Sequence, residues 1–273
     1  MAKQRLKVLI TVKTAPIPSK KYDELVCTAG VREDGTFIRL YPINFRDLPF
    51  DKQYRKYQWI EVDAEKHKGR DTRKESWKPD SDSLQVGEVI DTKGDSTWSA
   101  RGKHVLPKSA KSMEALWDAQ ELDKTSLGIF KPKKIHDLTI EKLDDPDWDP
   151  SFLEALKQAR LWDDRKNSAE PPRKMPYKLS FQFECDDIRC KRNHQMMIED
   201  WEVSALYWRL VDKGASPEDA AKEVRRKFLD ELCGPSRDTH FFVGTVLEHG
   251  TWVVIGVWWP ALPKKEPQKK LPF

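Results

Sequence analysis

Hydrophobic and polar positions alternate along the first part of the chain with a period of two, which is the pattern of β-strands with one buried face. Such runs occupy 6–14, 25–31, 37–41, 57–64 and 85–91. The Asp34-Gly35 pair between the second and third runs predicts a tight turn, and therefore a hairpin. Five short strands separated by loops favour a small barrel or sandwich over a parallel α/β sheet.

The second part of the chain mixes helical and strand patterns. Apolar positions with helical spacing predict helices at 112–122, 150–162, 198–211 and 216–232. Asp149 and Ser216, each followed by a proline, are typical N-cap residues for two of these helices. Strands are predicted at 135–140, 177–185, 240–246 and 252–259, the last two as a nearly all-apolar hairpin. The expected fold class is a mixed, β-rich α+β protein.

The composition excludes a disordered chain but gives little evidence about partners. The 273 residues are 38% hydrophobic and 34% charged, and they include eleven tryptophans and eleven phenylalanines. Disordered chains are poor in aromatic residues. The net charge of +4 permits binding to nucleic acid without indicating it. Basic stretches at 3–21 and 264–270 are typical of solvated extensions.

Cysteine usage bears on the compartment. The chain has four cysteines, at positions 27, 185, 190 and 233. The apolar run 6–12 is short and interrupted by Lys7, so no signal peptide is predicted. No apolar run approaches the roughly 20 residues that cross a bilayer. We therefore expect a cytoplasmic, reduced protein without a membrane contact, whose thiols are metal ligands or buried apolar groups.

The densest group of potential metal ligands is Cys185-x4-Cys190-x3-His194, between a predicted strand and a predicted helix. It contains three of the four ligands of a structural zinc site. The fourth ligand could be Cys27, Cys233, Asp186, Asp187 or water. The alternative is that Cys185 ends a buried strand, while Cys190 and His194 only pack or form hydrogen bonds. Zinc at Cys185, Cys190 and His194 is the metal that this spacing predicts.

Two acids follow at the start of the next predicted helix, Asp200 and Glu202. Acidic residues there stabilise the helix dipole, which is a sufficient structural explanation. A functional hypothesis uses His194, Asp200 and Glu202 as the catalytic residues of a metal-dependent nucleotide- or nucleic-acid-processing enzyme. The chain has no phosphate-binding loop, dinucleotide-binding fingerprint or nucleophile elbow that would indicate another enzyme class.

Arginines lie beside aromatic residues in the loops of the first part of the chain. Arginine next to an exposed ring can bind phosphate and stack with bases of a single-stranded nucleic acid. An ordinary network of surface ion pairs with half-buried rings has the same appearance. The residues that we predict to contact nucleic acid are Lys13, Arg39, Tyr41, Arg46, Arg73 and Trp77.

Several motifs together resemble one known family. They are VLITVKT at 8–14, VCTAG at 26–30, IRLYP at 38–42, Asp71-x-Arg73-x-Glu75-Ser76, Phe130-Lys131-Pro132, the Cys185–Glu202 block, and FFVG at 241–244 followed by Gly256 and Pro260. This pattern, over nearly the whole chain, is similar to the prokaryotic dual OB-containing domain family. The resemblance implies two OB-type barrels and a nucleic-acid-binding role in prokaryotic conflict or phage-defence systems. It implies no catalytic residues.

These observations lead to a domain prediction and a leading function. We expect a first OB-like module at 1–110, a helical connector with a possible strand at 111–166, a linker or exposed loop at 167–176, a second OB-like module with helices at 177–263, and a basic tail at 264–273. The leading hypothesis is a protein that binds single-stranded DNA or RNA, with no catalytic activity assigned. The alternatives are the metal-dependent enzyme described above, and an interaction subunit whose apolar C-terminal hairpin binds a protein partner encoded in the same operon.

Overall fold

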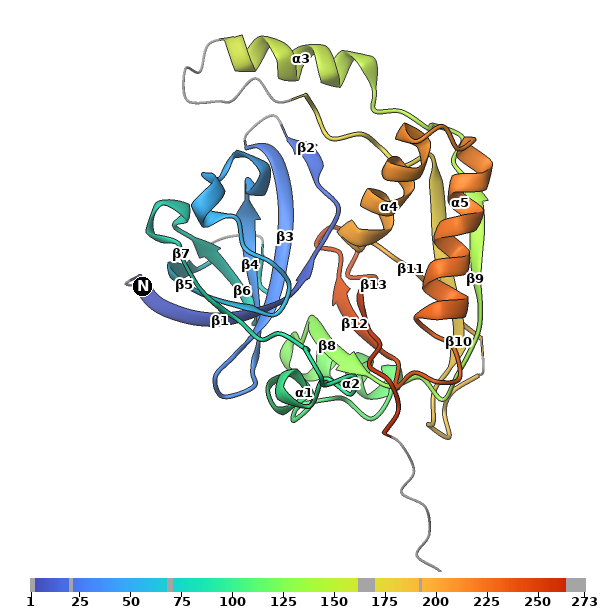
Figure 1. The fold of residues 1–273 in the computed structure, drawn as a ribbon. Coiled ribbons are helices and arrows are strands. Elements are labelled where there is room, and N and C mark those ends of the chain that lie inside the picture. Colours follow the sequence, from blue (N-terminus) through green and yellow to red (C-terminus); the bar gives the residue numbers. More distant parts are fainter. Residues whose placement is uncertain (1–2, 20–21, 68–70, 162–169, 192, 264–273) are drawn as a thin grey trace, which may run out of the picture.

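Five strands of the N-terminal half close into a β-barrel in the computed structural model, which describes residues 3–19, 22–67, 71–161, 170–191 and 193–263 (Figure 1). Around the barrel the order is β1 (Gln4–Lys13), β3 (Asp23–Arg32), β4 (Phe37–Ile43), β6 (Ser76–Pro79) and β5 (Gln58–Lys66), and β5 pairs with β1. Only the β4–β6 pair is parallel. Outside this ring, β2 (Ile17–Ser19) pairs with β3, and β7 (Gln85–Val89) pairs with β5.

The alternating sequence pattern accounts for the barrel interior. Ile60, Val62 and Ala64 of β5 are buried, whereas Glu61 between them is exposed. They form one core with apolar residues of β1, β3 and β4. Burying a large aliphatic side chain contributes roughly 1.5–3 kcal/mol, so this core stabilises the closed barrel. The connections carry three short 3₁₀ turns, which are η1 (Phe45–Asp47), η2 (Phe50–Lys52) and η3 (Ser81–Ser83).

The C-terminal half contains two three-stranded antiparallel sheets. One has the order β13 (Trp252–Trp258), β12 (His240–Thr245) and β8 (Leu127–Phe130). The other has the order β11 (His194–Met197), β10 (Tyr177–Glu184) and β9 (Lys134–Lys142). A parallel bridge between Ile198 and Val254 connects the two sheets.

The described residues form five α-helices. They are α1 (Ser99–Val105), α2 (Met113–Asp123), α3 (Pro150–Leu161), α4 (Trp201–Asp212) and α5 (Pro217–Arg225), the last followed by the π-helical turn η4 (Arg226–Glu231). In Figure 1, α4 and α5 lie side by side on one face of the β9–β10–β11 sheet. Val203, Tyr207 and Val224 from these helices share a core with Phe181 and other sheet residues. No helix among the described residues is both long and apolar enough to cross a bilayer.

The two halves meet across a third core and a buried polar network. Apolar residues of both halves, including Val12 of β1 and Phe242 of β12, pack in that core. The Arg39 guanidinium on β4 donates hydrogen bonds to the hydroxyl and carbonyl of Ser126, at 2.7 and 2.9 Å. The Glu75 carboxylate accepts hydrogen bonds from the backbone and hydroxyl of the same Ser126. The barrel and the C-terminal half are therefore held together by buried contacts.

The β-rich α+β fold class and the first β-barrel are confirmed, and most predicted elements have counterparts. Four strands, β2, β6, β8 and β11, and the helix α1 were not predicted. Residues 167–169 of the predicted linker and the whole predicted tail at 264–273 lie outside the described residues. Residues 170–176 run as an irregular segment, with Arg173 paired to Asp212 on α4. The module boundaries remain predictions.

Candidate metal centre and basic cleft

The predicted ligands lie at the hairpin formed by β10 and β11. Cys185 follows the last residue of β10, Cys190 lies in the connecting loop, and His194 begins β11. Phe183 pairs with His194 across the two strands, and the two rings stack with centroids 5.0 Å apart. The Cys185 backbone N–H donates to the Cys190 sulfur at 3.2 Å, which folds the loop back over the strand end.

A fourth potential ligand comes from helix α2. The Glu114 Oε1 atom lies 2.8 Å from His194 Nε2, and the Cys190 Sγ atom lies 3.2 Å from the same nitrogen. One ligand atom from each of Glu114, Cys185, Cys190 and His194 lies within 4.8 Å of the others, and we call these residues the metal-binding cluster. Around a tetrahedral zinc ion, ligand atoms are about 3.3–3.8 Å apart, so a metal ion fits with small side-chain movements.

The cluster is enclosed. The side chains of His194 and Glu114 are 8% and 5% exposed, and the ring of Trp117 lies 5.3 Å from that of His194. Burial raises the pKa of the Cys185 thiol to about 12. A buried thiol with a raised pKa is a poor nucleophile, because the thiolate is the reactive form. This environment therefore argues against a catalytic role for Cys185.

The contacts of His194 do not match those of a Cys-His-Glu catalytic triad. In a triad, the nucleophile and the orienting acid contact different ring nitrogens of the histidine. Here Cys190 and Glu114 both face Nε2, which is the arrangement of ligands around a common centre. The second oxygen of Glu114, Oε2, is buried and has no protein partner. Among the described residues, this is the only group of acids, cysteines and histidines that could hold a metal ion.

None of the four residues considered as a fourth ligand belongs to the metal-binding cluster. Cys27 lies in β3 of the barrel, Cys233 follows η4, and neither belongs to the cluster. Asp187 instead accepts a hydrogen bond from Ser112 and pairs with Arg189, while Asp186 pairs with Lys133. Glu114 was missed because it is distant in sequence, and because an acid in the first turn of a helix is usually explained by the helix dipole.

The alternative enzyme site is not assembled. His194 faces Glu114, whereas Asp200 is the N-cap of α4 and accepts a hydrogen bond from the Glu202 backbone. The Lys56 ammonium lies 2.9 Å from carboxylate oxygens of both Asp200 and Glu202. Burial raises the pKa of Asp200, although Lys56 opposes that shift. Asp200 and Glu202 therefore hold α4 to the barrel, and the structure does not bring them together with His194.

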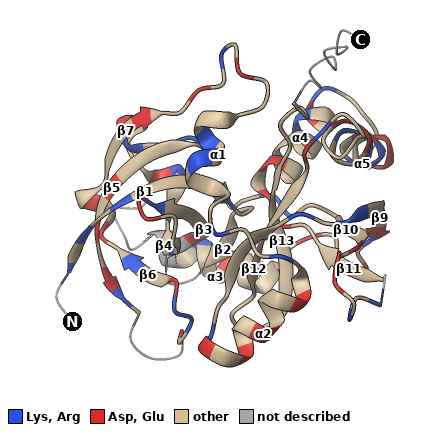
Figure 2. Ribbon diagram, turned by 90° about the horizontal axis from the view of Figure 1, so that it is seen from below, with Lys and Arg blue, Asp and Glu red and all other residues tan. Residues whose placement is uncertain are grey.

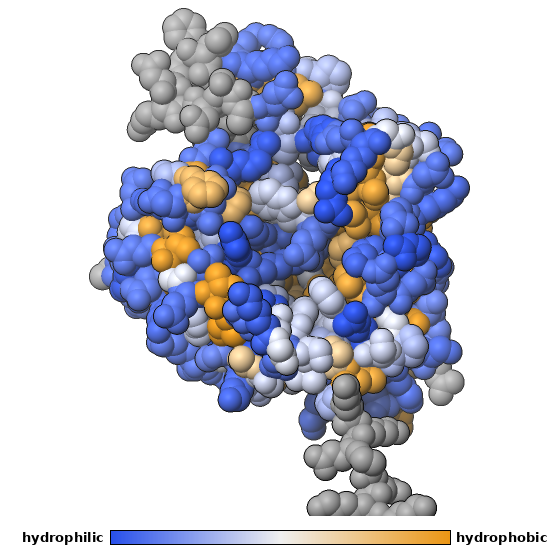
Figure 3. Space-filling model, in the orientation of Figure 1, coloured by the Kyte–Doolittle hydropathy of each residue, from blue (hydrophilic) through white to orange (hydrophobic). Residues whose placement is uncertain are grey.

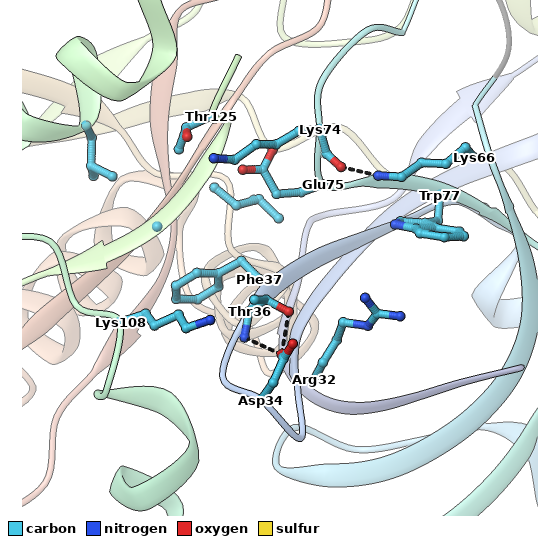
Figure 4. Close-up of a pocket in the computed structure, with 13 residues that line it drawn as sticks. Arg32, Asp34, Thr36, Phe37, Lys66, Lys74, Glu75, Trp77, Lys108 and Thr125 are labelled. Atoms are coloured by element: carbon cyan, nitrogen blue, oxygen red, sulfur yellow. Dashed lines mark hydrogen bonds between the residues drawn. The ribbon is translucent and has the colours of Figure 1, made fainter. Parts of the chain in front are cut away.

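A basic cleft of about 560 Å³ lies between the barrel and the C-terminal half (Figure 4). It is lined by four cationic, two acidic and two aromatic side chains, which are Arg32, Lys66, Lys74, Lys108, Asp34, Glu75, Phe37 and Trp77. In Figure 4 the Trp77 indole lies between Lys66 and Arg32, whose charged groups are 4.6 and 5.8 Å from the ring centroid. Leu116 and Thr125 from the C-terminal half complete the wall.

The predicted nucleic-acid contacts have different surroundings. Trp77 lines the basic cleft, although it is only 8% exposed. Arg39 is 2% exposed and bound to Ser126, so it cannot contact a ligand in this arrangement and instead joins the halves. Arg73 pairs with Asp71 and donates to a carbonyl of β12, and Tyr41 is half-buried.

The other two predicted contacts lie near the junction with α4. Arg46 pairs with Glu24, and the Lys13 ammonium lies 3.9 Å from the Phe45 ring centroid and 5.2 Å from that of Trp201. Sequence reasoning missed most of the basic cleft, since Arg32, the 66–74 region and Lys108 come from three separate parts of the chain. Arg32, Lys66 and Lys108 have no local motif that sets them apart from an ordinary surface cation.

The apolar C-terminal hairpin is not an open surface. Every residue of β12 and β13 is buried, and the hairpin packs between the barrel and the other sheet. Its apolar side chains are used in these two cores, so they are not available to bind a protein partner. The interaction-subunit hypothesis therefore loses the surface on which it was based.

Two family models match the chain. A domain of unknown function, DUF8758, matches residues 4–107, and another, DUF8757, matches residues 108–272. No curated protein matches it. The border between the two matches falls between α1 and α2. The metal-binding cluster thus lies within the DUF8757 match, whereas residues of both matches line the basic cleft.

Proposed function

We propose that this chain, which belongs to the DUF8757 family, binds single-stranded nucleic acid in the basic cleft. The observation that carries the proposal is the grouping of four cationic side chains and two aromatic rings around one cleft. Cations bind the phosphates of a single strand, and aromatic rings stack with its exposed bases. A cleft of about 560 Å³ has the size of a pocket for one small ligand, such as a nucleotide unit of the strand.

The exposed cations of the cleft support binding of a phosphate backbone. Lys74 and Lys108 are exposed, and they come from opposite sides of the junction. Phe37 is half-buried, so its ring is more accessible to a base than that of Trp77. Figure 2 shows Lys and Arg interspersed with Asp and Glu over both halves, and the face in Figure 3 is mostly hydrophilic. The excess of cations in the cleft is therefore a local feature.

The connectivity of the barrel supports an OB-like identity. Counted along the chain, its five strands close in the order first, second, third, fifth and fourth. OB folds are five-stranded Greek-key barrels that bind oligonucleotides on the second and third strands and at the loop between the fourth and fifth. Here Arg32 and Phe37 belong to β3 and β4, and Lys74 belongs to the β5–β6 connection. We extend the proposal to the C-terminal half as a second, more open OB-like module.

We also propose that the metal-binding cluster holds zinc. Cys and His are the usual ligands of structural zinc, while Ca²⁺ and Mg²⁺ prefer oxygen ligands only. Two thiols, one imidazole and one carboxylate would fill a tetrahedral zinc site without leaving a position for substrate. Such a closed site is structural, so zinc would stabilise the 185–193 loop against α2 rather than supply catalysis.

A salt titration tests the binding proposal. Fluorescein-labelled single-stranded DNA and RNA of about 16 nucleotides match the site size of one or two OB modules. We expect the anisotropy of both probes to report binding, with log K falling linearly against log salt by about 0.7 for each phosphate neutralised. Four cations predict a slope near −3, to about one unit. Absence of binding to both probes at low salt would refute the proposal.

A further inference from the structure

We infer that the metal bound by the metal-binding cluster positions one wall of the basic cleft, through helix α2. The inference rests on the proposed binding of nucleic acid in that cleft. It concerns two sites that share a single structural element. One end of α2 supplies the metal ligand Glu114, and the other end is joined to the cleft residue Lys74.

The N-terminal end of α2 is attached to the loop that carries the thiols. Ser112, the N-cap, donates a hydrogen bond to Asp187 at 3.0 Å, and the Met113 N–H donates to the Cys185 sulfur at 3.4 Å. One turn further along, Asp118 pairs with Arg189 at 2.9 Å. These contacts and Glu114 fix the start of the helix relative to the 185–194 hairpin.

The C-terminal end of α2 and the residues after it form the cleft wall. Asp123, the last helical residue, pairs with Lys74 at 2.5 Å and accepts hydrogen bonds from Thr125. Leu116, in the middle of the helix, lines the cleft and packs on Gly128, where even a Cβ atom would lie 2.6 Å from a Leu116 methyl group. A shift of the helix would therefore move Leu116 against Gly128 of β8 and change the Asp123–Lys74 pair.

Metal binding has a direct consequence for this helix. Without a cation, the buried Glu114 carboxylate faces His194 through Oε1, while its Oε2 atom has no hydrogen-bond partner and two sulfurs lie nearby. A divalent ion neutralises this charge and ties Glu114 to the hairpin. Its removal favours movement of Glu114 away from the hairpin. Because α2 is a single helix about 16 Å long, that movement reaches Leu116 and Asp123.

The expected effect is a coupling between metal and nucleic acid. Coupled sites typically change one another's affinity by roughly 5- to 150-fold. We expect removal of zinc from the full chain with 1,10-phenanthroline to weaken binding of labelled oligothymidylate about tenfold. The salt slope should fall by about 0.7 if the phosphate contact of Lys74 is lost. Added ZnCl₂ should restore both values.

A double-mutant cycle tests the route through α2. In Lys74→Ala, zinc removal should weaken oligothymidylate binding by less than threefold, because the contact that zinc positions is already absent. In Lys66→Ala, on the barrel wall, the effect of zinc removal should remain about tenfold. Val224→Ala, in the same core as Leu116 but on α5, controls for general destabilisation and should leave affinity unchanged.

The outcomes separate this inference from the proposed function. If the zinc-loaded chain does not bind the oligonucleotide, the proposed function fails and the inference with it. If it binds equally well with and without zinc, or if Lys74→Ala and Lys66→Ala behave alike, only the inference is overturned. If near-ultraviolet circular dichroism shows that the metal-free chain unfolds, the Glu114→Gln variant is tested in the presence of zinc instead of the chelator-treated protein. Unchanged affinity and salt slope in Glu114→Gln would then overturn the inference.

Discussion

Glu114 Oε1 lies 2.8 Å from His194 Nε2, although the two residues are separated by 80 positions and belong to a helix and a strand. The contact completes a cluster of four potential metal ligands, and it attaches α2 to the β10–β11 hairpin. The same helix reaches the basic cleft at its other end. One contact therefore relates the metal-binding cluster to the site that we propose for nucleic acid.

Replacement of a thiol ligand should abolish metal binding. We expect the purified wild-type chain to contain near-stoichiometric zinc and Cys190→Ser to contain little. Loss of a structural metal lowers the free energy of unfolding by at least about 2 kcal/mol, because binding energy at such a site is folding energy. Elemental analysis and thermal melts measure both effects.

Cys233→Ser is the matched control for that experiment. Cys233 is a half-buried thiol outside the metal-binding cluster, so the substitution should leave the zinc content unchanged. Wild-type protein without zinc, or equal zinc in Cys190→Ser, would contradict the assignment.

Replacement of Arg39 should loosen the junction of the two halves. The Arg39→Met side chain would leave the buried hydroxyl and carbonyl of Ser126 without their guanidinium donors. Leaving buried polar groups without partners costs about 1–3 kcal/mol, so we expect a loss of at least about 2 kcal/mol. Chemical denaturation measures the change. Arg55→Met, at an exposed position, should fall within about 0.5 kcal/mol of wild type, and equal stability of the two variants would refute this role.

Lys13 predicts a pH dependence with a defined sign. Burial, together with the nearby Lys56 ammonium, lowers the pKa of Lys13 to about 8 from its ordinary 10.5, while Glu202 and Asp200 oppose the shift. Between pH 8 and 10.5 the unfolded chain therefore holds a proton that the folded chain has released. The contribution of Lys13 to the free energy of unfolding must therefore rise with pH across that window.

The measurement compares wild type with Lys13→Met, in which this titration is absent. The difference in unfolding free energy, wild type minus variant, should become more favourable to wild type from pH 8 to 10.5. Urea denaturation at several pH values gives the difference. A constant difference, or one that falls with pH, would show that the pKa of Lys13 is not lowered.

The sequence predicted those features that depend on residues close together along the chain. Period-two alternation predicted four of the five barrel strands, because alternate residues such as Ile60 and Val62 enter one core. The fifth, β6, was not predicted, and the predicted strand at 85–91 corresponds to β7, which lies outside the barrel ring. The spacing of Cys185, Cys190 and His194 predicted three members of the metal-binding cluster, because these residues lie within ten positions of one another. β8 was missed because all four of its residues are buried, which removes the alternation.

Features that depend on tertiary contacts could not be predicted from the sequence. Arg39 alternates with Ile38 and Leu40, which enter the barrel core, so it points away from that core, as an exposed cation would. In the structure the C-terminal half covers this outer surface and buries Arg39. Glu114 and the basic cleft were likewise missed, because their partners come from distant segments.

Binding of a single-stranded oligonucleotide to matched lysine variants tests the central claim most directly. Lys66→Ala with Lys108→Ala removes one cation of the basic cleft from each half, whereas Lys78→Ala with Lys103→Ala removes two cations that do not line it. The account predicts that the cleft variant loses about fivefold in affinity at 0.1 M salt for each phosphate contact removed. Its salt slope should be shallower by about 0.7 for each such contact. The control variant should resemble wild type in both respects. Equal affinity of the two variants would contradict nucleic-acid binding in the basic cleft.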